Sequence, residues 1–230
     1  MTLELSESPL QAAPAGASRP LLGRLREPVG GLTHLAGAAL AAVGLVALVA
    51  RPGGALRTAA FAVYGASLVL LYLSSSAYHL LPLSPAGVAR LRRLDHLMVF
   101  LLIAGTYTPV SLLALSGAWG WTVFGLVWGF AALGFVQAWL WLDAPRWLTT
   151  AIYVCAGWVG VVAIVPLARV LPAAGLFHLL AGGVVYTTGA VVYARKRPDP
   201  WPGRFGFHEI WHLFVIGGSA FHYAMMWTLP

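Results

Sequence analysis

The sequence predicts an all-α integral membrane protein, a bundle of seven transmembrane helices. Of its 230 residues, 60% are hydrophobic and 9% are charged, whereas soluble globular proteins have roughly 45–50% apolar and about 25% charged residues. Apolar segments of about 20 residues recur along the chain, and each is long enough to cross roughly 30 Å of hydrocarbon. They are too long and too uniformly apolar for the alternating strands of a membrane barrel. The composition therefore excludes a soluble enzyme and a disordered chain.

The seven expected spans follow one another at close intervals. They cover residues 29–50, 58–81, 95–115, 119–141, 147–167, 173–194 and 207–228. Turn-forming sequences rich in Pro, Gly, Ser and Asp separate most of them, at 51–54, 84–87, 143–146, 171–172 and 197–203. Residues 1–26 are expected to form a flexible cytosolic tail, and residues 27–230 a single seven-helix membrane domain.

A few small residues and one proline are expected to shape the bundle. Pro109 lies inside the third span and should bend it. Gly125 and Gly129 have the four-residue spacing that lets membrane helices approach closely. Cys155 is interpreted as a small buried residue. As the single cysteine of the chain, it excludes both an intramolecular disulfide and a cysteine-rich zinc site, so any metal must be bound by nitrogen and oxygen.

The basic residues predict the orientation of the bundle. Counted on alternate sides of the seven spans, 11 of the 14 lie on the side of the N-terminal tail, and the other three are Arg51, Arg57 and Arg169. Because Lys and Arg favour cytoplasmic connections, we expect a cytosolic N-terminus and an outside C-terminus. The 14 basic residues are 13 Arg and one Lys, and with much Ala and Gly this suggests a GC-rich bacterial genome and hence a bacterial inner membrane. The basic residues lie between apolar segments and not along one helix face, so we expect no nucleic-acid partner.

Four ionisable residues gather at one depth of the predicted bundle. His79 lies near the end of the second span, Asp95 begins the third, and His208 and His212 begin the seventh. All four therefore fall on the cytosolic side. An ionisable group inside a span is costly, which makes each of them a candidate functional residue. For Asp95, a helix-start acid favoured by the helix dipole is the alternative interpretation.

The spacing of the histidines favours a metal site. His208 and His212 lie one helical turn apart on the same face, where two imidazoles can bind one zinc ion, and a third histidine, His79, and the Asp95 carboxylate lie at matching depth. Three protein ligands leave a fourth position for water, as in catalytic zinc sites. Ser75, one turn before His79, can hydrogen-bond a water or an oxyanion. Imidazole also binds copper, nickel and iron, so zinc is the preferred metal and not the only candidate.

The other polar residues receive weaker interpretations. His34, which lies near the inner surface, is a candidate supporting residue of the metal site, as are Glu27 and His222. His222 lies near the His208 face but deeper, where it either forms the floor of a cavity or hydrogen-bonds a neighbouring helix. His96 and Glu209 point away from the expected site, which suggests an interfacial histidine and a non-catalytic carboxylate.

Three motifs carry a resemblance to a known family. They are LeuTyrLeuSerSerSerAlaTyrHis at 71–79, LeuAspHis at 94–96 leading into LeuIleAlaGlyThrTyrThrPro at 102–109, and HisGluIleTrpHis at 208–212. In these motifs residues 27–230 resemble the bacterial hemolysin III family. That family is grouped with the progestin and adiponectin-receptor (PAQR) proteins and, more distantly, the alkaline ceramidases, all seven-helix membrane proteins with a cytosolic N-terminus.

The resemblance implies roles for individual residues. It implies that His79, His208 and His212 bind zinc, that Asp95 hydrogen-bonds the zinc-bound water, and that Ser75 lines the site.

The first span matches the family only in part. The family often has Glu, Asn and ThrHis at its start. Here Glu27 is present and Thr33 and His34 are retained, but Gly30 stands where the Asn would be. This difference puts any hydrogen bond through that amide in doubt.

Three functional hypotheses follow. In the first, the protein is a zinc-dependent hydrolase of a lipid amide or ester at the cytosolic leaflet, in which Asp95 orients or deprotonates the water, Ser75 stabilises the oxyanion, and membrane lipids are the substrates. In the second it is a non-catalytic receptor or lipid-homeostasis protein with structural zinc. The third is a pore-forming haemolysin, which the composition disfavours because a secreted cytolysin needs a soluble form.

Overall fold

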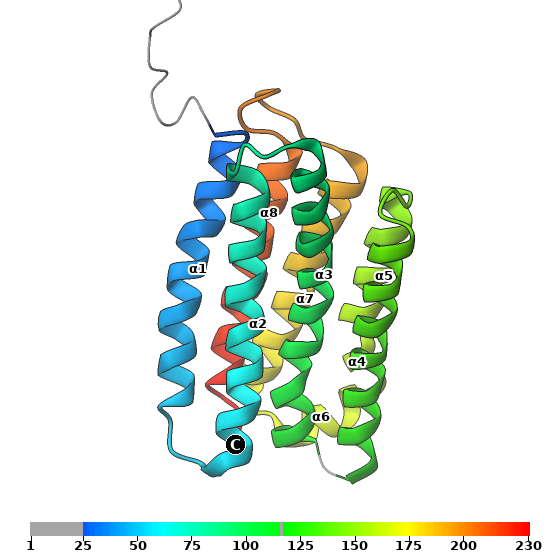
Figure 1. The fold of residues 1–230 in the computed structure, drawn as a ribbon. Helices are drawn as coiled ribbons and strands as arrows, with labels where there is room; N and C mark the ends of the chain where they lie inside the picture. Colours follow the sequence, from blue (N-terminus) through cyan, green and yellow to red (C-terminus); the bar gives the residue numbers. More distant parts are fainter. Residues whose placement is uncertain (1–24, 116) are drawn as a thin grey trace, which may run out of the picture.

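The structure is a computed structural model that describes residues 25–115 and 117–230, so nearly all of the predicted tail lies outside the described residues. This part of the chain is a helical bundle with no β-strand (Figure 1). The helices are α1 (Pro28–Val49), α2 (Gly54–Leu80), α3 (Pro85–Pro109), η2 (Val110–Ala114, a π-helix), α4 (Gly117–Leu140), α5 (Arg146–Gly157), η3 (Val159–Ala163, a 3₁₀ helix), α6 (Ile164–Val170), α7 (Ala173–Arg195) and α8 (Phe207–Met226).

Six helical segments of the described chain are long and apolar enough to cross a membrane. They are α1, α2, α3 with η2, α4, the continuous segment Arg146–Val170, and α7. The all-helical membrane class is therefore confirmed. At 20 residues α8 extends about 30 Å, a sufficient length. It is absent from the six because four polar residues lower its hydropathy: His208, Glu209, His212 and His222. The seven-span count stays a prediction.

The third helix begins ten residues before the expected start of its span. Ser84 is the N-cap and its hydroxyl accepts a hydrogen bond from the Gly87 backbone N–H at 3.3 Å, while Pro85 occupies the first helical turn. The Ser-Pro-Ala-Gly sequence at 84–87, which was expected to form a turn, therefore forms the start of a helix. Asp95 consequently lies in the third turn of α3, beyond the reach of the helix dipole. Its interpretation as a helix-start acid is wrong.

Pro109 ends the α-helical part of this segment. The chain continues as the π-helix η2, because a proline lacks the N–H that the regular hydrogen-bond pattern needs. The sequence predicts a bend at Pro109, and the structure has a change of helix type there.

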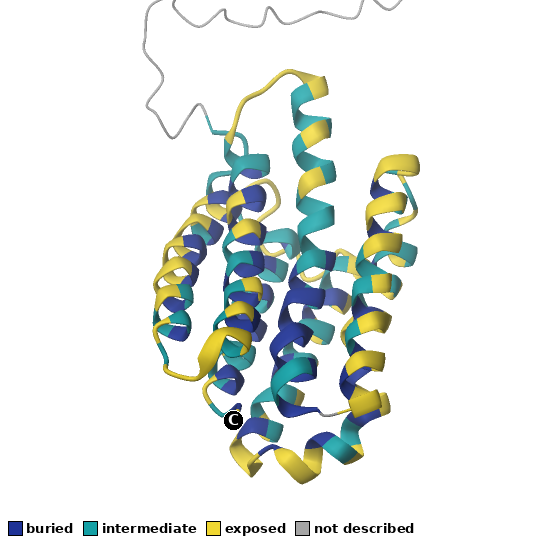
Figure 2. Cartoon of the chain, turned by 60° about the horizontal axis from the view of Figure 1, so that its bottom comes forward, coloured by how far each residue is buried: buried dark blue, intermediate teal, exposed yellow. Residues whose placement is uncertain are grey.

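The buried apolar core draws on α1, α2, α3, η2, α4, η3, α6 and α8, with partly buried residues of α7 packed against it. Phe61, Tyr64 and Leu71 of α2 are buried there with Val110 of η2 and Met225 of α8. Figure 2 shows buried residues on the inner faces of the helices and exposed residues on the outer faces. The exposed residues include many large apolar side chains, as expected for a surface that contacts hydrocarbon.

Two expectations about small residues are wrong. A Cβ built on Gly125 or Gly129 would meet no atom within 4 Å, so this glycine pair makes no close helix contact among the described residues. Cys155 is exposed and not buried. Both errors have one cause: these residues face outward from α4 and α5, which lie along one edge of the bundle (Figure 1), and sequence hydrophobicity does not distinguish lipid from core.

The fold brings distant segments of the chain to one end of the bundle. At this end α1 begins, α2 ends, and α3 and α8 begin (Figure 1). Asp95 lies in the third turn of α3. The residues singled out by the sequence therefore converge on a single place.

Candidate metal centre

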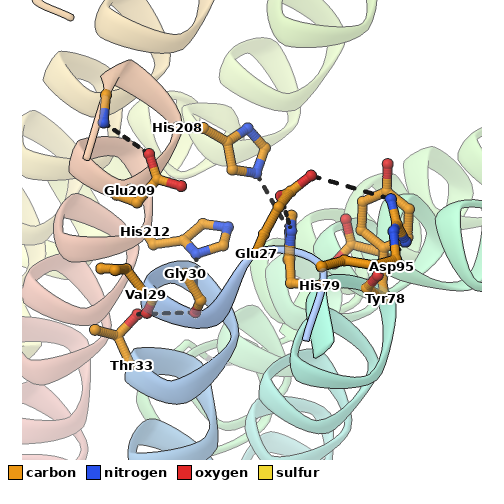
Figure 3. Close-up of polar contacts among 12 residues, drawn as sticks. Glu27, Val29, Gly30, Thr33, Tyr78, His79, Asp95, His208, Glu209 and His212 are labelled. Atoms are coloured by element: carbon orange, nitrogen blue, oxygen red, sulfur yellow. Dashed lines mark hydrogen bonds and ion pairs between the residues drawn. The ribbon is translucent and has the colours of Figure 1, made fainter. Parts of the chain in front are cut away.

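Three histidines form a compact cluster at this end of the bundle. His79 comes from the last turn of α2, and His208 and His212 come from successive turns of α8 (Figure 3). One ring nitrogen from each lies within 4.8 Å of the other two. His79 and His212 are buried, with 1% and 2% of their surface exposed. Within the described chain this is the group of three or more potential ligands that can hold a metal ion.

One pair of ligands in the cluster has the spacing that a zinc ion requires. Zinc–nitrogen bonds of about 2.0–2.1 Å place two tetrahedral ligand nitrogens about 3.3 Å apart. The Nε2 atoms of His208 and His79 are 3.3 Å apart. The donor set, three imidazoles and no cysteine, also suits zinc.

Two of the histidines already engage their other ring nitrogen. His79 Nδ1 lies 2.5 Å from Glu27 Oε2, and His212 Nδ1 lies 3.3 Å from the Gly30 carbonyl oxygen. Both oxygens are acceptors, so each Nδ1 carries the proton and each Nε2 keeps its lone pair for a metal. Such outer hydrogen bonds fix the orientation of metal-binding imidazoles.

Glu27 joins the start of α1 to the end of α2. Its backbone N–H donates to the His79 carbonyl oxygen at 2.9 Å, and its carboxylate accepts from the His79 ring. This hydrogen bond holds the pKa of Glu27 below its ordinary value, against the opposing effect of partial burial. Arg26 lies 4.0 Å away and adds a weaker attraction. The structure thus places the predicted supporting residue Glu27 directly on a predicted ligand.

The Gly30 backbone accepts a hydrogen bond at the position where the family often has an asparagine side chain. Its carbonyl oxygen accepts the His212 hydrogen bond, and a Cβ at this position would lie 3.0 Å from His212 Nδ1. That separation is tighter than ordinary van der Waals contact, so the close approach of His212 to α1 favours glycine. Sequence reasoning missed this role, because backbone acceptors leave no signal in side-chain patterns.

His34 lies behind His212. The two rings stack with centroids 3.8 Å apart and planes at 21°. His34 is buried, and neither of its ring nitrogens has a hydrogen-bond partner among the described residues. The contact fits the predicted supporting role, which acts here through ring packing.

Asp95 and Ser75 share a large cavity with the histidines. The cavity has a volume of about 1210 Å³, and both residues line it together with the three histidines. Ser75 is buried and neighbours the Asp95 carboxyl group, which is 19% exposed. His96 Nδ1 donates to the Arg92 carbonyl oxygen at 2.8 Å, so its ring turns back to line the cavity 3.8 Å from Asp95. The expectation that His96 points away is wrong.

The two remaining candidates have defined partners. His222 donates to the Leu179 carbonyl oxygen of α7 at 3.3 Å and also lines the cavity, so contacts for both of its alternative interpretations are present. Glu209 accepts from the Gly206 backbone N–H at 2.8 Å and so stabilises the first turn of α8.

Comparison with known proteins gives the family. A family model described as haemolysin-III related matches residues 22–223. The chain belongs to this family.

Two bacterial relatives cover most of this haemolysin-III related chain. Hemolysin-3 of Bacillus cereus is 38% identical over 204 residues, 86% of this chain and 90% of that protein. Hemolysin-3 homolog of Bacillus subtilis (strain 168) is 36% identical over 192 residues, 82% and 87% of the two chains.

A more distant relative supports the same family. The adiponectin receptor protein of Drosophila melanogaster is 26% identical over 223 residues, 83% of this chain and 48% of that one. With its long apolar helices, the haemolysin-III related protein is a multi-pass protein of the cell membrane.

The contact between Glu27 and His79 gives a first test of the centre. Glu27→Gln keeps an acceptor but removes the charge that makes the imidazole a stronger ligand, so we expect zinc affinity to fall roughly 10–100-fold. Competition with a chromophoric chelator measures it. Glu209→Gln is the matched control, because Glu209 neighbours His208 in sequence but bonds the backbone. Equal affinities of the two variants would contradict the role of Glu27.

Proposed function

We propose that this haemolysin-III related protein is a zinc-dependent hydrolase that cleaves a lipid amide or ester at the cytosolic leaflet. The observation that carries the proposal is the set of three histidines with the Asp95 carboxylate in one large cavity. Three protein ligands leave a coordination position open, which is the arrangement of catalytic zinc sites, whereas structural sites are usually closed by four.

The proposal includes an orientation. Basic residues favour a cytosolic N-terminus, and α8 is long enough to serve as a seventh crossing despite its polar residues. In that orientation the histidine cluster lies near the inner leaflet. The cost of placing several ionisable groups at this depth is the reason to expect a functional role for them.

Each polar group has a place in the reaction. Zinc held by the histidines supplies Lewis-acid activation of water and of a carbonyl group. Asp95 orients the attacking water and accepts its proton as the water oxygen bonds to the acyl carbon. The same proton passes to the leaving amine or alcohol as the C–N or C–O bond breaks. Ser75 donates a hydrogen bond to the developing oxyanion.

The cavity favours a lipid substrate. Its wall is largely apolar, with Leu71, Leu102, Ile103 and Val215 beyond the histidines, and its volume of about 1210 Å³ exceeds that of most small-ligand pockets. An acyl chain buries apolar surface there, while a polar substrate loses its hydration. Amides and esters of fatty acids combine such a chain with a carbonyl group that zinc can polarise.

The names of the relatives keep two other functions as candidates. A relative is named an adiponectin receptor, which favours a non-catalytic receptor or lipid-homeostasis protein with structural zinc. Others are named hemolysins, which favours pore formation. In both cases the Asp95 carboxylate has no chemical step to perform, so its replacement separates them from the hydrolase.

Removal of the metal tests the proposal. We expect purified protein to release fatty acid from at least one long-chain amide or ester, to lose this activity after chelator treatment, and to regain it with added zinc. Chromatography of the released fatty acid measures the rate. The absence of release from any lipid amide or ester by zinc-loaded protein would contradict the hydrolase.

A further inference from the structure

Arg146 begins α5 at the end of the bundle that holds the histidines, and it lines the same cavity. Its guanidinium carbon lies 4.5 Å from the centre of the Tyr193 ring and 5.4 Å from that of Phe207. Both rings also pack near His208, with centroid distances of 5.7 and 6.2 Å. A single layer of aromatic side chains therefore connects the cation to the histidine cluster.

The Nη1 atom of Arg146 lacks an acceptor in the part of the chain that the structure describes. This nitrogen is buried and has no hydrogen-bond partner there, and no carboxylate of the described residues lies within 4.0 Å. Of the three other cavity-lining arginines, two are engaged: Arg92 pairs with Asp143 at 2.8 Å, and Arg26 donates to the Tyr78 carbonyl oxygen at 2.7 Å. The third, Arg204, is exposed, so water can satisfy its donors. Burying a charged donor without an acceptor is costly, so this nitrogen is suited to a ligand anion.

The rest of the cavity indicates what carries the anion. It continues from the histidines past Leu102 and Val215 to His222, which lies three to four turns further along α8. A ligand that fills it therefore has an aliphatic part and ends in a charged group. Free inorganic anions would leave the apolar part unfilled.

We infer that Arg146 binds the carboxylate or phosphate of an anionic amphiphile whose acyl chain occupies the cavity. The inference rests on the proposed function in that it names the substrate class: an anionic lipid amide or ester instead of a neutral one. The aromatic rings hold the guanidinium plane, which presents two parallel N–H donors to the anion. Lysine has no such fork, so Arg146→Lys is not a conservative change here.

The test is equilibrium binding to zinc-free protein in detergent, where no turnover occurs. The probes are N-oleoylglycine and N-oleoylethanolamine, which share the chain and the amide and differ in having a carboxylate or a hydroxyl. We expect wild type to bind the acid at least tenfold more tightly. Arg146→Met should weaken the acid at least tenfold and leave the neutral amide unchanged.

Arg93→Met is the matched control. Arg93 is also an arginine of this end of the bundle, but it packs over Trp139 and does not line the cavity. The Arg93→Met variant should keep the wild-type preference for the acid. If Arg146→Met does not yield folded protein, Arg146→Lys replaces it and should reduce the preference severalfold.

Three results overturn the inference: equal binding of both probes by wild type, an unchanged preference in the folded Arg146 variant, or inorganic phosphate that binds with the same Arg146 dependence as the acid. The last result would mean that Arg146 binds a free inorganic anion and not a lipid. The anion-site inference and the hydrolase proposal can be disproved independently. Arg146-dependent binding without turnover removes the hydrolase alone, and turnover of neutral amides that is indifferent to Arg146 removes the anion site alone.

Discussion

Asp95→Asn is expected to lower the rate of lipid amide or ester hydrolysis about 10²–10⁴-fold, the usual contribution of a positioned general base. Asparagine has almost the same shape and still hydrogen-bonds water, but it cannot accept the proton that water loses on attack. The zinc content and the unfolding temperature should stay at the wild-type values, because Asp95 is not among the clustered ligands. Initial rates of fatty acid release, with zinc measured on the same samples, give the result.

Asp143→Asn is the matched control for this prediction. Asp143 is an exposed carboxylate that pairs with Arg92 near the same end of the bundle, so its loss should leave the rate within about twofold of wild type, as expected for an exposed ion pair. A rate for Asp95→Asn equal to that of the control would remove Asp95 from the chemistry. It would then favour the receptor with structural zinc.

The second large effect is expected for the metal ligands themselves. His208→Ala should weaken zinc binding by more than about 100-fold, because loss of a residue that only supports a ligand already costs roughly 10–100-fold. Competition with a chromophoric chelator measures the affinity, and activity should fall with it at limiting zinc. His178→Ala is the control, since His178 lies on α7, outside both the cluster and the cavity wall.

An unchanged affinity in His208→Ala would mean that the metal, if bound, is held elsewhere. A stable protein that binds zinc through other residues would leave the histidine cluster as a packing feature. Thermal unfolding with and without zinc separates this result from simple misfolding, because a metal that binds only the folded state raises its stability.

The helical class and the three histidines could be predicted because each depends on a simple periodicity. Spans of about 20 apolar residues identify membrane helices whatever their contacts. The spacing of His208 and His212 places both on one face of any helix. The orientation predicted from the basic residues places His79 on the same side of the membrane as these two histidines. These inferences required no knowledge of which helices touch.

Other features depend on contacts that a single sequence does not contain. The start of α3 at Pro85 was missed because its first turns are polar, although Ser84 and Pro85 are recognisable cap residues. Gly125 and Gly129 face outward because α4 lies at the edge of the bundle. The backbone acceptor at Gly30 exists because α1 passes close to α8 there.

Elemental analysis of metal per chain tests the central claim most directly. The samples are detergent-purified wild type and the His208→Ala, His212→Ala double variant, each as isolated and after zinc resupply. The account predicts about one zinc per chain in wild type and almost none in the double variant. Metal-free wild type after resupply, or equal zinc in both proteins, would contradict a metal centre built on these histidines and the hydrolase that depends on it.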